Sequence, residues 1–199
     1  EFDLKLSRDI FCFVYWSALQ TITMADDEKE YDDDIMHVFY RNPDITSYAA
    51  PTRPSLVLYS HIAHKGVQLA GVFGMASGML GLAMGRSGLK LLKGMSKTAA
   101  ISMVFTEFFG LSKAYNSISK IPKSEQQDGI EDRAFRIFHN SRQNQIDRYS
   151  IIGVGAGAVC IPVLMGPSLV SVVGGVGLGS GCGLLAFGAS QAAKFSGAE

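Results

Sequence analysis

The sequence predicts an all-α membrane protein with four transmembrane helices, glycine-rich packing faces and an N-terminal extramembrane arm. No charged residue occurs from Tyr149 to Ala193, and this run is long enough for two crossings because one crossing needs about 20 apolar residues. Hydrophobic residues make up 47% of the chain, and it contains 22 glycines. The net charge is zero, yet residues 1–65 carry 11 acidic and 6 basic side chains whereas residues 66–148 carry 6 acidic and 11 basic. The hydrophilic parts are therefore polarised across a membrane.

The predicted arm covers residues 1–65. Residues 10–24 are rich in aromatic side chains but slightly short for a crossing, so we expect an interfacial helix or a contact with another subunit, with a fifth crossing as the alternative. An acidic patch follows, which we interpret as solvated or facing a partner: Asp26, Asp27, Glu28, Glu30, Asp32, Asp33 and Asp34. A chain of this composition orders when other chains hold it, so we expect the arm to act as a clasp.

The first two predicted crossings are residues 66–85 and 98–119. The first is free of charge between Lys65 and Arg86, two cations suited to the membrane boundaries. The second begins with apolar residues but carries Glu107 near its centre. We expect it to cross with Glu107 turned toward a partner or a wet cavity.

The last two predicted crossings are residues 149–165 and 168–190. They are separated at Gly166 and Pro167, because proline lacks the backbone donor that a continuing helix requires. A hydrophilic loop is expected at 120–148, and a short tail at 191–199.

The placement of cations predicts the topology. The connection after the first crossing contains no acidic residue and four basic ones: Arg86, Lys90, Lys93 and Lys97. Short loops rich in lysine and arginine face the cytoplasm or the mitochondrial matrix. Four crossings then place the arm, the C-terminus and residues 120–148 together on the opposite side.

Small residues recur every four positions in the predicted crossings. Lipid provides no hydrophobic reason for helices to associate, so close packing depends on small residues along one face. We expect helix packing at eight glycines: Gly66, Gly74, Gly78, Gly153, Gly157, Gly175, Gly179 and Gly183.

One carboxylate has a possible functional role. A carboxylate inside a membrane is costly, so Glu107 indicates a pathway or a specific partner. The alternative is a static bond to a neighbouring helix. We favour the static bond, because a pathway needs several polar groups in register and the sequence shows one.

The chain lacks the patterns of an enzyme. No serine, cysteine or carboxylate is visibly paired with a base, so we predict no catalytic residue. His61 and His64 lie three positions apart, but no third ligand is evident, so we expect interfacial hydrogen bonding and no metal. The glycines at 153–157 lack the preceding strand and following acid of a dinucleotide site. We expect no small-molecule substrate and no nucleic-acid partner.

The glycine faces, the cationic first connection and the run from Asp147 to Gly153 resemble the mitochondrial inner-membrane import translocases of the Tim type. Their four-helix fold is shared by an accessory subunit of respiratory complex I. The resemblance covers residues 66–190 and implies a multi-pass protein of the mitochondrial inner membrane with both termini toward the intermembrane space. The chain departs from the import subunits at Ser150, where they typically have asparagine, and in having Glu107 nearly alone instead of an acidic groove.

These departures favour a non-catalytic accessory subunit of a respiratory complex, with complex I as the expected assembly. Its expected partners are other membrane subunits and phospholipid, with cardiolipin as the candidate ligand of the basic cluster Arg86, Lys90, Lys93 and Lys97. No other cofactor is expected. The alternative is a subunit of an import translocase or a solute transporter that acts through Glu107. A lipid-organising membrane protein outside mitochondria is a third hypothesis.

Overall fold

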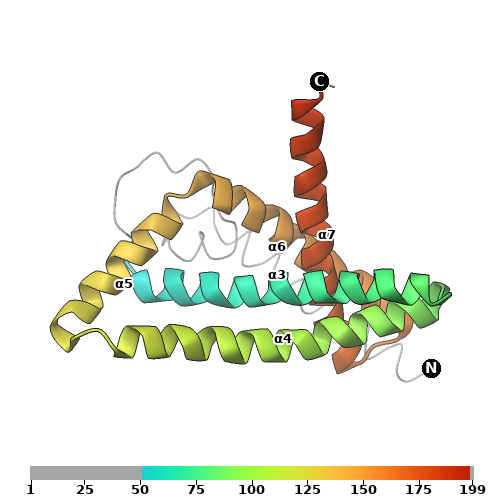
Figure 1. The fold of residues 1–199 in the computed structure, drawn as a ribbon, viewed down its shortest axis with the longest axis horizontal. Helices are drawn as coiled ribbons and strands as arrows, with labels where there is room; N and C mark the ends of the chain where they lie inside the picture. Colours follow the sequence, from blue (N-terminus) through green and yellow to red (C-terminus); the bar gives the residue numbers. More distant parts are fainter. Residues whose placement is uncertain (1–50, 198–199) are drawn as a thin grey trace, which may run out of the picture. The chain divides into compact units, whose positions relative to one another are not determined.

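The computed structural model describes residues 51–197, which form five α-helices (Figure 1). They are α3 (Pro54–Ala83), α4 (Gly88–Ser119), α5 (Lys123–Phe138), α6 (Ser141–Met165) and α7 (Leu169–Phe195). The all-α prediction is confirmed for this part of the chain. The predicted interfacial helix at 10–24, the acidic patch and most of the arm lie outside the described residues, as do the last two residues of the tail.

Three of the described helices, α3, α6 and α7, are long and apolar enough to cross a membrane. The predicted crossing at 98–119 lies within α4, which does not meet the same measure. Five charged side chains lower the hydropathy of α4: Lys90, Lys93, Lys97, Glu107 and Lys113. The composition of the described helices therefore supports a multi-pass membrane protein with three candidate spans.

Two tight connections create two helical hairpins. Gly85 lies in the connection after α3 and has φ +73°, a left-handed conformation that favours glycine. This turn lets α4 return along α3. Gly166 has φ +91° after α6, and Ser168 then caps α7 by accepting a hydrogen bond from the Ser171 backbone amide at 3.1 Å. The break predicted at Gly166 and Pro167 is thus where α6 ends and α7 begins.

The segment predicted as a hydrophilic loop, residues 120–148, is largely helical. It contains α5 and the first two turns of α6. Although the exposed face of α5 is charged, its Ala134 and Phe138 are buried against Val57 of α3. This amphipathic packing stabilises α5, although α5 contains no long apolar run. Likewise, Lys90, Lys93 and Lys97 lie within α4 and not in a loop.

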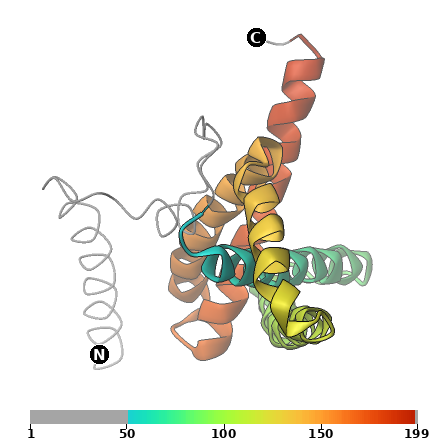
Figure 2. The same ribbon diagram turned by 90° about the vertical axis from the view of Figure 1, so that its left-hand side faces the viewer.

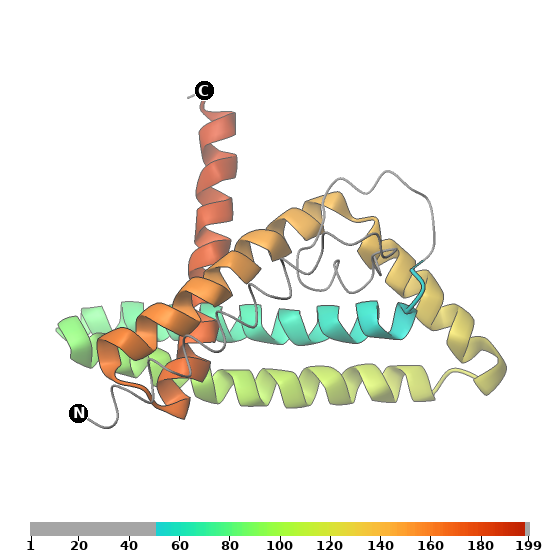
Figure 3. The same ribbon diagram turned by 180° about the vertical axis from the view of Figure 1, so that it is seen from behind.

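The helices associate as two pairs. α3 runs antiparallel to α4, and α6 packs along the N-terminal part of α7 (Figures 1 and 3). α5 contacts the beginning of α3 and leads into α6 (Figure 2). α7 crosses the α3–α4 pair steeply, and its C-terminal turns project beyond the other described helices (Figures 1 and 3). Helices that cross steeply cannot all follow one membrane normal, so any bilayer that holds both pairs contains tilted helices.

Candidate functional site

The most polar buried feature is a group of side chains between α3 and α6, which we call the Asp147 cluster: His61, His64, Lys65, Gln68, Gln143 and Asp147. Asp147, on α6, has no exposed surface. Its Oδ1 accepts hydrogen bonds from Lys65 Nζ at 2.7 Å and from Gln68 Nε2 and Gln143 Nε2, both at 2.8 Å. One carboxylate oxygen therefore receives three donors from two helices.

Two histidines surround the same carboxylate. His61 Nδ1 lies 3.3 Å from Asp147 Oδ2, and His64 Nε2 lies 4.0 Å from Asp147 Oδ1. Both rings are largely buried. The described residues contain no group of three or more histidine, cysteine, aspartate or glutamate side chains arranged to hold a metal ion. Both histidines lie beside Asp147 as polar neighbours.

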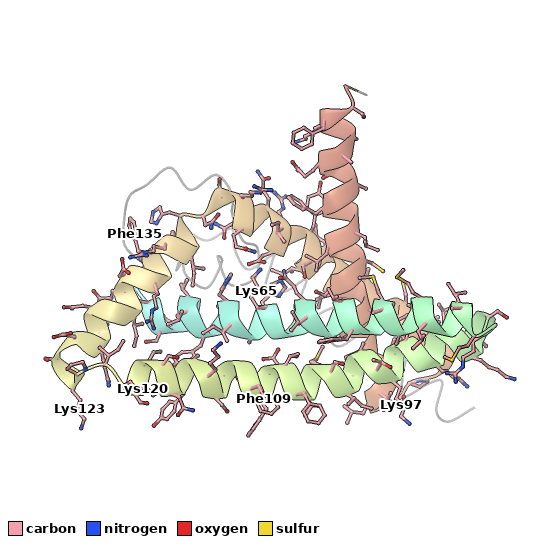
Figure 4. All side chains as sticks on the ribbon, in the orientation of Figure 1. Lys65, Lys97, Phe109, Lys120, Lys123 and Phe135 are labelled. Atoms are coloured by element: carbon pink, nitrogen blue, oxygen red, sulfur yellow. The ribbon has the colours of Figure 1, made fainter. Side chains whose placement is uncertain are left out.

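Helical periodicity brings the cluster together. The members from α3 are spaced at i, i+3, i+4 and i+7 and so lie on one face of that helix, while Gln143 and Asp147 are one turn apart on α6. Lys65 points from α3 toward α6 (Figure 4) and also donates to Gln68 Oε1 at 2.7 Å. Next to Gln143 on α6, Asn144 Nδ2 donates a hydrogen bond to the Phe138 carbonyl at 2.9 Å and fixes the corner between α5 and α6.

The geometry of the cluster suits a static link between helices. A buried carboxylate is tolerated when a cation and hydrogen-bond donors compensate its lost hydration, and Lys65, Gln68 and Gln143 do so here. Lys65 retains 35% of its side-chain exposure, whereas Asp147 is inaccessible. The carboxylate is thus engaged by its own chain.

The sequence analysis did not identify this cluster. It treated His61 and His64 as interfacial residues, used Asp147 only as part of a family resemblance, and counted Glu107 as the single polar group of the crossings. The missed signal is the polar stripe on α3 together with the polar first two turns of α6. Spacing reveals each stripe, but not that the two stripes face one another.

The predicted packing glycines of α6 and α7 lie at the contact between these helices. A Cβ atom on Gly153 would collide with the Gly179 carbonyl oxygen, and one on Gly157 would collide with the Gly175 carbonyl oxygen. Gly183 similarly approaches the Tyr149 carbonyl oxygen. The two backbones are therefore in direct contact along the helices, with no room for side chains between them.

The predicted packing glycines of α3 face different partners. Gly66 lies against the Glu107 side chain, Gly74 against Leu178 and Ala99, and Gly78 against Met95. A further contact of the same helix was not predicted. Gly71 meets the backbone of α7, where a Cβ atom would collide with the Gly177 carbonyl oxygen.

Glu107 lies where α4 touches α3. Its side chain is half-buried beside Gly66, and its Oε1 is buried without a hydrogen-bond partner among the described residues. The neighbouring Thr106 Oγ1 donates to the Gly66 carbonyl at 2.9 Å. Glu107 belongs to the α3–α4 contact and is not part of the Asp147 cluster.

The four residues of the predicted basic cluster are all exposed: Arg86, Lys90, Lys93 and Lys97. Three of them share the outward face of α4, because they are spaced at i, i+3 and i+7. They do not approach Glu107, which is turned toward α3.

The resemblance to the Tim-type translocases rests on motifs of this sequence and stays a prediction. Compared with protein-family models, with curated proteins and with solved structures, this chain has no match.

Proposed function

We propose that this chain is a non-catalytic structural subunit of a membrane assembly, and that the assembly is a respiratory complex of the mitochondrial inner membrane, with complex I as the first candidate. The Asp147 cluster carries the proposal. Its carboxylate is inaccessible and engaged by three donors of the same chain, as in a link that holds helices in place. The compartment and the complex come from the sequence resemblance to the Tim-type fold.

The proposal includes a fourth crossing by α4. Its outward surface is apolar over the middle turns, where Ile101, Val104, Phe105, Phe108 and Phe109 are exposed. A surface with this many exposed aromatic and branched side chains is suited to contact with lipid or with the apolar face of a neighbouring subunit. With four crossings the arm and the C-terminus lie on the same side, which the resemblance identifies as the intermembrane space.

The proposed partners are neighbouring membrane subunits and phospholipid. Both hairpins expose large apolar side chains, among them Met79 and Leu80 of α3 and Val163 and Leu169 at the other connection. Beside them, the basic cluster supplies the positive charge that attracts anionic headgroups, cardiolipin among them.

The test is a native-gel separation of gently solubilised mitochondrial membranes, followed by mass spectrometry of each band. Comigration of this chain with active complex I is the expected result. Migration with import components, or in a small separate complex, would contradict the proposal. An Asp147→Asn variant adds a structural test, since a linking role predicts less assembled complex at equal expression.

One observation favours the alternative of a transporter or import subunit. The buried Oε1 of Glu107 has no hydrogen-bond partner among the described residues, so one acceptor of this carboxylate is unsatisfied inside the α3–α4 contact. Under this alternative, Glu107→Gln lowers solute or polypeptide transport by isolated mitochondria and leaves assembly intact. A normal transport rate in that variant would exclude a role of Glu107 in transport.

A further inference from the structure

The contacts between α3 and α4 define how the two helices are aligned. Gly66 lies beside Glu107, Gly74 beside Ala99, and Gly78 beside Met95. Residue numbers rise along one helix by as much as they fall along the other, so the antiparallel register is uniform. This register places Glu107 level with Gly66, next to the boundary residue Lys65, and not at mid-span. It also places Lys97 level with Ala76.

Ala76 lies halfway along the charge-free segment 66–85 of α3. Lys97 of α4 is therefore level with the middle of this segment, and Lys93 is one turn nearer the connection at 84–87. At about 1.5 Å per residue, Lys97 is roughly 15 Å from that connection, farther than a lysine side chain extends. For a crossing of α4 close to the membrane normal, snorkelling alone does not bring its ammonium group to the membrane surface.

Both lysines face outward. Lys93 and Lys97 are exposed, and Lys97 and Phe109 project from α4 on the side away from α3 (Figure 4). The outward stripe of α4 is thus cationic in its first half and apolar in its second, where Val104, Phe105 and Phe108 are exposed. A surface that is apolar along the same stripe is suited to the hydrocarbon region, so the cations require an anionic partner at this depth.

Within residues 51–197, no acidic residue lies near these lysines in the sequence. None occurs between Asp44 and Glu107 or between Asp147 and Glu199, so the hairpin turns at 84–87 and 166–168 carry no negative side chain. The ion pairs among the described residues join Asp147 to α3 and Asp132 to Arg136, and none includes Lys93 or Lys97. The described residues therefore supply no counter-charge to Lys93 and Lys97.

We propose that Lys93 and Lys97 bind the phosphate of an anionic phospholipid, and that they draw this headgroup below the plane of its neighbours. The inference rests on the proposed membrane crossing of α4. Side chains four residues apart on a helix lie about 5–6 Å apart at Cβ, so two ammonium groups can contact one phosphate. A zwitterionic headgroup carries its own cation, so an anionic lipid compensates the lysines better.

The first test measures lipid retention. The full-length protein is reconstituted in nanodiscs of mixed phosphatidylcholine and cardiolipin, extracted in mild detergent and analysed for bound phospholipid by native mass spectrometry. We expect the wild type to retain cardiolipin, the Lys93→Gln/Lys97→Gln variant to retain several-fold less, and a matched Lys113→Gln/Lys120→Gln variant at the C-terminal end of α4 to retain the wild-type amount. Equal retention in the two double variants, or an acidic polypeptide bound in place of lipid, would overturn the proposal.

The second test measures depth. A fluorophore is attached at Ala76→Cys, in a background with Cys12, Cys160 and Cys182 replaced by alanine, and quenched by lipids spin-labelled at the headgroup or at mid-chain. In the otherwise wild-type protein we expect the headgroup label to quench the fluorophore more strongly than the mid-chain label. In the Lys93→Gln/Lys97→Gln variant we expect the mid-chain label to quench it more strongly. Dominant mid-chain quenching in both proteins would reject this inference alone. Release of the protein from membranes by alkaline washing would instead reject the proposed function.

Discussion

Lys65 and Asp147 lie 82 positions apart in the chain and meet at 2.7 Å as an ion pair between α3 and α6. The carboxylate is fully buried, and Gln68 and Gln143 donate to the same oxygen. Two helices from different hairpins are therefore joined by a charge and its hydrogen bonds, whereas the α6–α7 contact depends on glycine.

Removing Lys65 should destabilise the fold strongly. Lys65→Ala leaves Asp147 buried without its cation, and breaking a buried pair from one side costs about 3–5 kcal/mol, reduced here because Lys65 is partly exposed. Unfolding in mixed detergent micelles, followed by circular dichroism, measures the change. Arg136→Ala is the control, since its pair with Asp132 is exposed on α5 and should contribute little. Equal effects of the two variants would refute the structural role of Asp147.

The buried hydroxyls of Ser150 and Ser180 should be energetically coupled. Their oxygens lie 2.6 Å apart between α6 and α7, and neither residue has exposed surface. Each single alanine variant should lower the free energy of unfolding by about 0.6–1 kcal/mol, because it leaves the other hydroxyl without this hydrogen bond. A double-mutant cycle on unfolding free energies measures the coupling. Strict additivity would show that the hydrogen bond contributes nothing.

Two glycines two positions apart on α6 should respond oppositely to alanine. A Cβ atom on Gly157 would collide with the Gly175 carbonyl oxygen, so Gly157→Ala forces the helices apart at a cost of about 1–3 kcal/mol. A Cβ atom on Gly155 meets no atom within 4 Å, so Gly155→Ala should be neutral or stabilising by up to about 1 kcal/mol through helix propensity. Thermal unfolding in detergent compares the two. A larger loss at Gly155 than at Gly157 would contradict the α6–α7 contact.

The first hairpin should depend on backbone conformation at Gly85 and not on space. Gly85 has φ +73°, and a Cβ atom there would meet nothing within 4 Å. Gly85→Ala should therefore lower the free energy of unfolding by about 1–2 kcal/mol, because alanine is strained in the left-handed conformation. Gly85→Asn should lower it less, because asparagine tolerates this conformation. Thermal unfolding again measures the difference. If alanine and asparagine behave alike, backbone strain is not what selects glycine at this position.

Several elements follow from local sequence alone. Uninterrupted apolar runs predict long helices, proline and glycine at 166–167 predict the break between α6 and α7, and small residues at four-residue spacing predict faces for close packing. These features depend on periodicity and on the conformational limits of single residues, which act over one or two helical turns. The positions of Gly157 and Gly175 at a helix contact belong to this group.

Other features were decided by contacts between distant segments. The helix at Lys123–Phe138 is stabilised by burial of Ala134 and Phe138 against Val57, so its charged composition concealed it. The pairing of Lys65 with Asp147 and the alignment of Lys97 with Ala76 depend on which helix faces are apposed and in what register. The sequence by itself determined the long apolar helices, their break and their glycine faces, because these arise within a few residues. The tertiary structure alone decided the partner of the buried charge and the register of α4 along α3, because both depend on the relative positions of helix faces that the local sequence does not specify.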